Sequence, residues 1–281
     1  MTIFEFINFL ILITIQSITE FLPVSSSGHL IIYSSIFPEN FDLSFENLSL
    51  HVLLHLGSAT AIIVYFFDEW KKIIADFFSN MRSKKLIFNE WDNDGQISIK
   101  IICATIPAVL IGFFFYETIA NNLRNNYVVA IALLVGALIL FFAEKYNNLY
   151  EPQALNRMSF KNYFLLGVMQ SLAFIPGLSR SGIVISSALF LKINKKDSVK
   201  IAFLMSCPVI IGATIHELIF NFNELIFDDM SMVIIAYSYA FISSLLVIKF
   251  LFHFINKYNF SYFVGYRVAL SMLLLCSEFF G

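Results

Sequence analysis

The chain has 281 residues, of which 58% are hydrophobic and only 14% are charged, and its mean hydropathy is +0.77. A soluble domain carries about 25% charged residues, so this composition excludes an ordinary soluble protein and indicates a polytopic membrane protein. The formal net charge is −2 and no basic cluster alternates with aromatic residues, so nucleic acid is not an expected partner.

Six apolar segments are long enough to cross a membrane as helices. A helix rises about 1.5 Å per residue, so roughly 20 residues cover a hydrocarbon core of about 30 Å. The predicted spans cover residues 51–67, 97–116, 128–142, 199–220, 232–252 and 262–280. We therefore expect an all-α integral membrane protein that forms a single membrane domain over residues 1–281.

Two further apolar stretches, residues 4–37 and 162–191, are each interrupted by a turn rich in Pro, Gly and Ser. The limbs beside each turn are about 8–15 residues long, which is too short to cross a membrane. Irregular backbone at membrane depth is tolerated where it is buried in protein or lines a cavity. We therefore predict two re-entrant helical hairpins, each with its polar loop near the middle of the membrane.

The polar loops of the two hairpins resemble each other in sequence. Laid over one another without gaps, residues 16–17 and 170–171 both read Gln-Ser. In the same alignment, Ser-Ser-Ser-Gly at 25–28 meets Ser-Arg-Ser-Gly at 179–182. This match indicates that the chain is duplicated and that the two loops are halves of one site.

Basic residues are distributed unevenly between the two sets of loops. If both hairpins re-enter, the loops 38–50, 117–127 and 221–231 hold Arg124 alone, and the opposite loops hold many Lys and Arg residues. Such a bias places the basic side in the cytoplasm. The hairpins then enter from opposite faces, as in an inverted-topology repeat with its site at the repeat interface. Repeat 1 is predicted over about 1–145, and repeat 2 over about 155–281.

Gln16 and Glu20 lie four residues apart, so a helix places them on one face beside the first loop. A carboxylate in a half-buried polar cavity can bind a divalent cation or accept a proton. Glu20 is therefore a candidate metal ligand or base. The alternative is that Glu20 only satisfies backbone donors at the hairpin, and that the uncharged Gln16 only orients a ligand.

The first loop also places three hydroxyls next to an imidazole. A helix can restart after these serines, and the free N–H groups at a helix start favour phosphate. His29 is close enough in sequence to take a proton from a serine or to protonate a leaving group. The alternative is that the serines only cap the helix. The three hydroxyl residues are Ser25, Ser26 and Ser27.

Two further histidines lie at the start of a predicted span. His51 and His55 are spaced i, i+4, so a helix presents both on one face. They could form half of a metal site. A position lining a core or a channel is the favoured interpretation.

Arg180 carries the strongest signal in the second loop. A guanidinium in a buried turn of Gly and Ser needs an anionic partner, and a phosphate held by two hydrogen bonds fits it well. Ser179 and Ser181 flank it with hydroxyls. The alternative is an ion pair with Glu20 across the repeat, which would also bring the two loops together. Together, these groups predict a phosphoryl-transfer centre for a substrate whose remainder is lipid.

The two loops resemble the signature motifs of the bacterial undecaprenyl-diphosphatase family, the bacitracin-resistance membrane phosphatases. The match covers residues 16–29, with Gln-x-x-x-Glu and a Ser-rich loop ending in Gly-His, and residues 176–182, with Pro-Gly-Leu-Ser-Arg-Ser-Gly. The pattern of spans and hairpins extends the resemblance over the whole chain. Two positions depart from it: Gln16 stands where the family often has a second Glu, and Val184 where it often has Thr.

The resemblance implies hydrolysis of undecaprenyl (polyprenyl) diphosphate to the monophosphate and phosphate. This reaction recycles the carrier lipid for peptidoglycan synthesis and confers bacitracin resistance. A divalent cation, Mg²⁺ or Ca²⁺, is also implied, as is a location in the bacterial cytoplasmic (inner) membrane with the site opening to the periplasmic side. The polyprenyl diphosphate lipid and the bilayer are thus the implied partners, and a homodimer is left open beside a monomer.

The resemblance also implies a role for each matching residue. Ser26 would be the nucleophile, His29 its acid/base partner and Arg180 the phosphate clamp. Glu20 would bind metal or act as base, with Gln16 as its companion in the metal site. Direct attack by a water molecule would use the same residues. The implied phosphate ligands beside Arg180 are Ser25, Ser27, Ser179 and Ser181.

A secondary transporter or lipid-phosphate flippase is the alternative function, since inverted repeats with broken helices are common among transporters. The grouping of serines with a histidine favours the enzyme, because transport needs no nucleophile. A purely structural membrane subunit is a third alternative. It does not account for a glutamate and an arginine at lipid depth.

Overall fold

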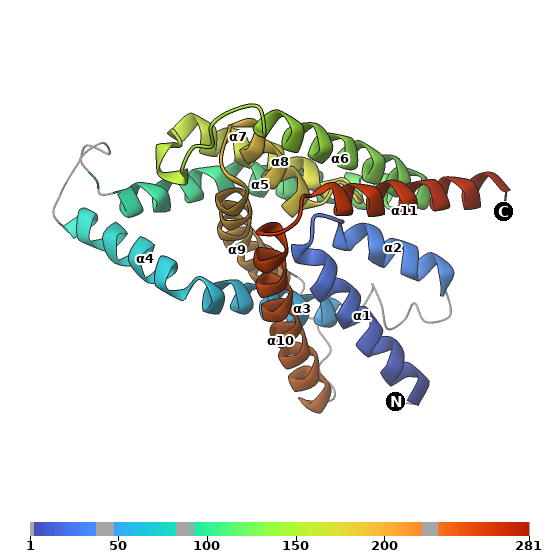
Figure 1. Ribbon diagram of the computed structural model, residues 1–281. Helices are drawn as coiled ribbons and strands as arrows, with labels where there is room; N and C mark the ends of the chain where they lie inside the picture. Colours follow the sequence, from blue (N-terminus) through green and yellow to red (C-terminus); the bar gives the residue numbers. More distant parts are fainter. Residues whose placement is uncertain (1–2, 38–47, 83–90, 92, 221–229, 281) are drawn as a thin grey trace.

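The computed structural model describes residues 3–37, 48–82, 91, 93–220 and 230–280, and within these ranges the regular elements are all helical (Figure 1). The predicted all-α class is therefore confirmed. Two 3₁₀ turns, η3 (Leu155–Arg157) and η4 (Leu172–Phe174), lie among the longer helices. The α-helices are α1 (Ile3–Phe21), α2 (Ser26–Ile36), α3 (Leu48–Tyr65), α4 (Phe67–Arg82), α5 (Asn93–Leu123), α6 (Asn126–Asn147), α7 (Phe160–Ser171), α8 (Arg180–Phe190), α9 (Lys195–Phe220), α10 (Met230–Ile255) and α11 (Ser261–Phe280).

Six helices in the described ranges are long and apolar enough to cross a membrane. Five of them, α5, α6, α9, α10 and α11, coincide with predicted spans. The sixth is α1, which has 19 residues and is therefore longer than the limb predicted for the first hairpin. The segment predicted to span at 51–67 is α3, which bends by 82° into α4. Of the predicted outer loops, 117–127 is described and is helical except at residues 124 and 125, because α5 continues to Leu123 and α6 begins at Asn126. Residues 38–47 and 221–229 of the other two loops lie outside the described residues.

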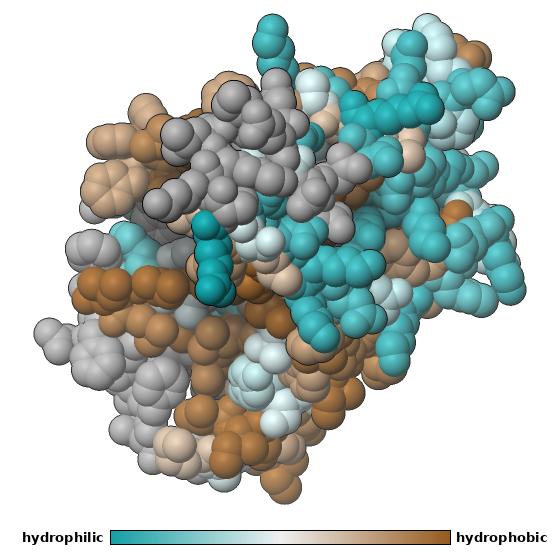
Figure 2. All heavy atoms as spheres, turned by 90° about the vertical axis from the view of Figure 1, so that its left-hand side faces the viewer, coloured by the Kyte–Doolittle hydropathy of each residue, from teal (hydrophilic) through white to brown (hydrophobic). Residues whose placement is uncertain are grey.

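Large apolar side chains cover much of the outer surface, which agrees with a multi-pass membrane protein. Phe113, Phe114 and Phe115 on α5 each expose more than half of their surface. Such exposure is unfavourable in water and natural in lipid. Figure 2 shows one face of the molecule on which hydrophilic and hydrophobic side chains are segregated into separate areas.

Both predicted hairpins are present as helix–turn–helix units. The chain turns back between α1 and α2, and again between α7 and α8 (Figure 1). Helix α1 packs against α2 and α10, and α7 packs against α5 and α8. The two turns touch, because the Gly177 N–H donates to the Ser25 hydroxyl at 3.1 Å.

The packing of the helices repeats itself between the two halves of the chain. Helix α5 packs on α7 and α9, and α10 packs on the corresponding helices α1 and α3. The related helices α3 and α9 also pack on each other, as do α6 and α11. Exchanging the halves thus maps these contacts onto one another, as an inverted repeat requires. The repeat boundaries at about 145 and 155 stay predictions.

Close contact between α5 and α7 fixes the second hairpin in place. A Cβ added to Gly167 would lie 2.2 Å from the Ala104 carbonyl oxygen, so this contact needs a glycine. Small residues of this kind let membrane helices approach closely. At the same contact the Gln170 side-chain amide donates to the Ala104 carbonyl at 3.4 Å, which anchors the end of α7 beside the second loop.

Candidate active site

The two polar turns have the same local structure. Ser25 precedes α2 and Ser179 precedes α8, with positive φ angles of 77° and 69°. Each hydroxyl accepts the N–H of the glycine three residues later, from Gly28 at 3.3 Å and from Gly182 at 3.2 Å. Both serines are therefore N-caps. The repeat seen in the sequence corresponds to a repeated helix start.

The turns are also tied directly to each other. Besides the bond from Gly177 to Ser25, the Ser181 hydroxyl donates to the Leu22 carbonyl at 3.0 Å. Gly177 has a φ of +100°, and a Cβ there would lie 2.6 Å from the Val129 carbonyl oxygen. Only glycine fits this position, where the second turn lies against α6.

Arg267 on α11 donates hydrogen bonds to backbone carbonyls of both turns. Its side chain is fully buried and lies among backbone carbonyls that compensate its charge. It donates to Pro23 O of the first turn and to Gly177 O and Leu178 O of the second, each at 3.0 Å. Two further bonds reach α6 carbonyls, at Leu133 and Ala132.

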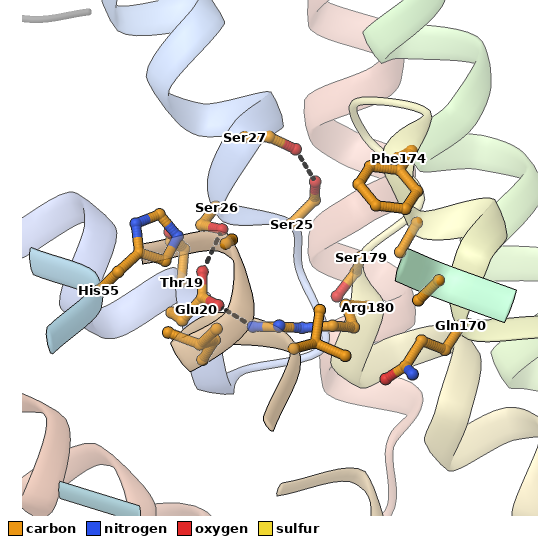
Figure 3. A pocket seen from close by; sticks show the side chains of 15 residues that line it. Thr19, Glu20, Ser25, Ser26, Ser27, His55, Gln170, Phe174, Ser179 and Arg180 are labelled. Carbon is orange, nitrogen blue, oxygen red and sulfur yellow. Dashed lines mark hydrogen bonds and ion pairs between the residues drawn. The ribbon is translucent and has the colours of Figure 1, made fainter. Parts of the chain in front are cut away.

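Glu20 and Arg180 meet between the two hairpins (Figure 3). The guanidinium of Arg180 donates to Glu20 Oε1, and the two side chains are 19% and 7% exposed, respectively. Glu20 Oε2 accepts the Ser26 hydroxyl at 2.7 Å and the Gln16 amide at 3.0 Å. Arg180 therefore forms the ion pair with Glu20 that the sequence offered as an alternative. This pair brings residues of both loops to one carboxylate.

Two adjoining cavities open beside this ion pair. The first has a volume of about 210 Å³ and is lined by Glu20, Ser26 and Arg180. The second, of about 310 Å³, shares Glu20 and Ser26 and extends to Arg124 and Glu217. Because the two cavities share lining residues, they adjoin within the helical bundle, and charged and hydroxyl groups line them beside apolar side chains. An anionic group of a ligand could therefore reach the Glu20–Arg180 pair.

His29 lines neither cavity. Its Nδ1 lies 2.7 Å from the Ser25 carbonyl oxygen, and its Nε2 lies 2.6 Å from the Tyr266 hydroxyl. The Ser26 hydroxyl bonds to Glu20 instead, so the structure does not bring the Ser26 and His29 side chains together. An acid/base role for His29 stays a prediction from the family resemblance.

The candidate phosphate-binding serines lie in different surroundings. Ser27 lines both cavities, whereas Ser25 and Ser179 line only the first and also cap helices. Ser181 is buried and is bonded to the Leu22 carbonyl. Val184, at the position where a Thr hydroxyl was expected, is fully buried in the core.

The residues near Glu20 fit a cation that takes most of its ligands from phosphate and water. In the described part of the chain, no group of three or more His, Cys, Asp or Glu residues could hold a metal ion by itself. Among the described residues, the buried side-chain oxygen of Gln16 has no hydrogen-bond partner, and Gln16 and Glu20 both line the second cavity. Mg²⁺ usually binds one or two carboxylates together with substrate phosphates and water. Glu20 and Gln16 match that requirement.

Sequence reasoning missed the roles of Tyr266 and Arg267, and it placed His55 only generally. His55 lines both cavities, which confirms the prediction that it lines a core or a channel. Arg267 is a lone charge inside an apolar segment, and this signal could have identified it. Tyr266 carries no local signal, because its partner His29 is 237 positions away.

Comparison with known proteins gives matches over nearly the whole chain. The sequence matches the family described as "Bacitracin resistance protein BacA" over residues 9–273. It is 35% identical over 270 residues to an undecaprenyl-diphosphatase of Elusimicrobium minutum, with 96% of each chain covered. It is 32% identical over 277 residues to one of Acinetobacter baumannii, with 99% of this chain and 97% of the relative covered. Identity to the corresponding protein of Nitrosospira multiformis is 30% over 272 residues, covering 97% and 94% of the two chains.

Proposed function

Because the chain belongs to the bacitracin resistance protein BacA family, we propose that it hydrolyses undecaprenyl diphosphate to the monophosphate and inorganic phosphate. The reaction returns the carrier lipid to peptidoglycan synthesis and confers resistance to bacitracin. The observation that carries this proposal is the ion pair of Glu20 and Arg180, one from each hairpin, beside a cavity inside an apolar bundle.

Substrate binding requires Arg180 to exchange partners. Without substrate its guanidinium is neutralised by Glu20. A diphosphate that enters the cavity offers several anionic oxygens, and a guanidinium can hold two of them at once. Ser27 lines the same space and adds a hydroxyl donor. The polyprenyl chain stays in the bilayer, where it contacts the apolar outer faces of the helices.

Ser26 is the nucleophile in this proposal, with Glu20 as its base. The hydrogen bond of 2.7 Å from the Ser26 hydroxyl to Glu20 Oε2 prepares the proton transfer. Ser26 Oγ bonds to the terminal phosphorus while the P–O bond to the lipid monophosphate breaks. A water molecule then attacks that phosphorus, the Oγ–P bond breaks, and Ser26 regains a proton as inorganic phosphate leaves. Arg180 neutralises the phosphoryl oxygens in both steps.

A divalent cation, Mg²⁺ or Ca²⁺, completes the proposed site. Glu20 and the unpartnered side-chain oxygen of Gln16 would hold it. When bound, the ion supplies positive charge that stabilises the diphosphate oxygens during the displacement. Gln16 keeps its amide N–H on Glu20 at 3.0 Å, so it orients that carboxylate as well.

The proposed location is the bacterial cytoplasmic membrane, with the site open to the periplasmic side. Supporting this, the second cavity extends toward Ile119, Arg124 and Glu217, which lie in or beside the segments predicted to face outward. Ion pairs that involve the predicted cytoplasmic lysines lie elsewhere, between Lys195 and Glu144 and between Lys200 and Glu69. The distribution of Lys and Arg gives the same orientation.

Phosphate release by the purified protein tests the proposed function. In detergent with Mg²⁺, the protein should release one phosphate from each undecaprenyl diphosphate and should leave undecaprenyl monophosphate intact. Absence of phosphate release from the diphosphate by folded protein would overturn the proposal. Movement of the lipid across vesicles without hydrolysis would instead support the flippase alternative.

A further inference from the structure

Two histidines lie near the reaction site, and their ring nitrogens are used differently. In His29 and in His55, the Nδ1 atom lies close to a backbone carbonyl oxygen, at 2.7 Å from Ser25 O and 2.8 Å from His51 O, respectively. A carbonyl can only accept, so Nδ1 carries the proton in both rings. In the neutral imidazole, Nε2 is then the acceptor in both.

The acceptor of His29 is occupied and the acceptor of His55 is not. The Tyr266 hydroxyl lies 2.6 Å from Nε2 of His29, and the two rings are stacked with centroids 5.6 Å apart. Among the described residues, Nε2 of His55 has no hydrogen-bond partner. One imidazole lone pair at the site is therefore free to hold a further molecule.

The free acceptor, Nε2, belongs to His55, whose ring lines the two cavities beside the Glu20–Arg180 pair. His55 lines both cavities together with Glu20 and Ser26, whereas His29 lines neither. Figure 3 shows the His55 ring on α3, on the same side of the cavity as Ser26 and the Glu20 carboxylate. Helix α3 packs against α9 and α10, so the ring is carried by a helix held on two sides.

We propose that Nε2 of His55 accepts a hydrogen bond from the water that attacks phosphorus, and so orients this water for the last step of the hydrolysis. The inference rests on the proposed function, since only a hydrolase needs such a water. It holds for both routes, because a water attacks either the phosphorylated Ser26 or the substrate itself. Orientation of a reacting water raises kcat and leaves substrate binding unchanged.

The test compares three substitutions at this position by kcat and KM for undecaprenyl diphosphate. His55→Gln places an amide oxygen near the position of Nε2, whereas His55→Asn places its amide near Nδ1, and His55→Ala removes both. We expect kcat to fall by about tenfold or more in His55→Ala and His55→Asn, with KM within about twofold of the wild type. His55→Gln should recover most of the rate.

His253→Gln is the matched control, because His253 is exposed near the end of α10 and lines neither of the two cavities. It should keep the wild-type kcat, and all variants should elute as folded protein from size exclusion. Wild-type kcat in His55→Ala, or equal rates in His55→Gln and His55→Asn, would overturn the inference and leave the proposed function intact. Absence of hydrolysis by the wild type would overturn both.

Discussion

Arg180 and Glu20 are 160 positions apart in the sequence, yet their side chains form an ion pair in the interior of the bundle. The pair joins the start of α8 to the end of α1, so each hairpin supplies one charge. A buried pair of this kind contributes little net stability by itself, because desolvation offsets the Coulombic attraction. The pair lies beside the cavity, and in the proposed function its two charges serve ligand binding.

Removal of the Ser26 hydroxyl distinguishes the covalent route from direct attack by water. Because Ser26 is the nucleophile in the proposed reaction, Ser26→Ala should lower kcat by about a thousandfold or more. Ser35→Ala, at the exposed end of the same helix, should leave kcat unchanged. Rates of phosphate release in detergent give the comparison. Turnover of Ser26→Ala near the wild-type rate would show that water attacks the substrate directly.

Replacing Arg267 by a residue with fewer N–H donors should destabilise the protein. A lysine at this position cannot reach all five carbonyl oxygens that Arg267 bonds, and it leaves buried acceptors unpaired. We expect Arg267→Lys to lower the free energy of unfolding by about 3 kcal/mol. Arg157→Lys, on the exposed surface, should change it by less than about 0.5 kcal/mol. Denaturant unfolding in mixed micelles measures both, and equal stabilities would contradict the clamp described for Arg267.

Adding a methyl group at Gly136 should also destabilise the protein, in this case because the methyl group collides with Arg267. A Cβ at this position would lie 1.9 Å from Nη2 of Arg267, which is held rigidly by its carbonyl partners. Gly136→Ala should therefore cost about 1–3 kcal/mol of unfolding free energy.

Gly265→Ala is the control for Gly136→Ala, because a Cβ on Gly265 would meet none of the described residues within 4 Å. Alanine favours the helix there by about 0.5–1 kcal/mol. The two variants should thus change the unfolding midpoint in opposite directions. A shift of both in the same direction would show that Gly136 does not leave room for the guanidinium.

Removal of divalent cations should abolish phosphate release, and added Mg²⁺ should restore it. If Gln16 and Glu20 hold the ion, Gln16→Glu adds a second carboxylate and should lower the half-saturating Mg²⁺ concentration by about tenfold. Phosphate release as a function of free Mg²⁺ measures this shift. Activity that persists in excess chelator would exclude a required cation, and an unchanged Mg²⁺ dependence of Gln16→Glu would exclude Gln16 as a ligand.

The local parts of the site were predictable from the sequence, because they depend on short patterns. Each of the two Ser-rich turns is a pattern of a few consecutive residues, at 25–28 and at 179–182, and each interrupts an apolar stretch. The spans followed from length and hydropathy, which decide whether a helix can cross lipid. The contact between Arg180 and Glu20 was predicted only as an alternative to phosphate binding.

The remaining features depend on contacts between distant segments. The partner of His29 lies 237 positions away on α11, so no local pattern could show that its Nε2 is occupied. The limbs of the first hairpin were predicted to be about 8–15 residues long, whereas α1 has 19 residues and continues to Phe21. The bend between α3 and α4 has no Pro or Gly in the sequence that would predict it.

Phosphate release by Glu20→Gln and Arg180→Gln is the measurement that tests the joint diphosphate site most directly. Each substitution removes one charge contributed by one hairpin, so each should lower phosphate release by about a thousandfold or more. Glu69→Gln is the control, since Glu69 forms a half-exposed ion pair with Lys200 and should keep the wild-type rate. Folded Glu20→Gln or Arg180→Gln that hydrolyses undecaprenyl diphosphate at the wild-type rate would contradict the site described here.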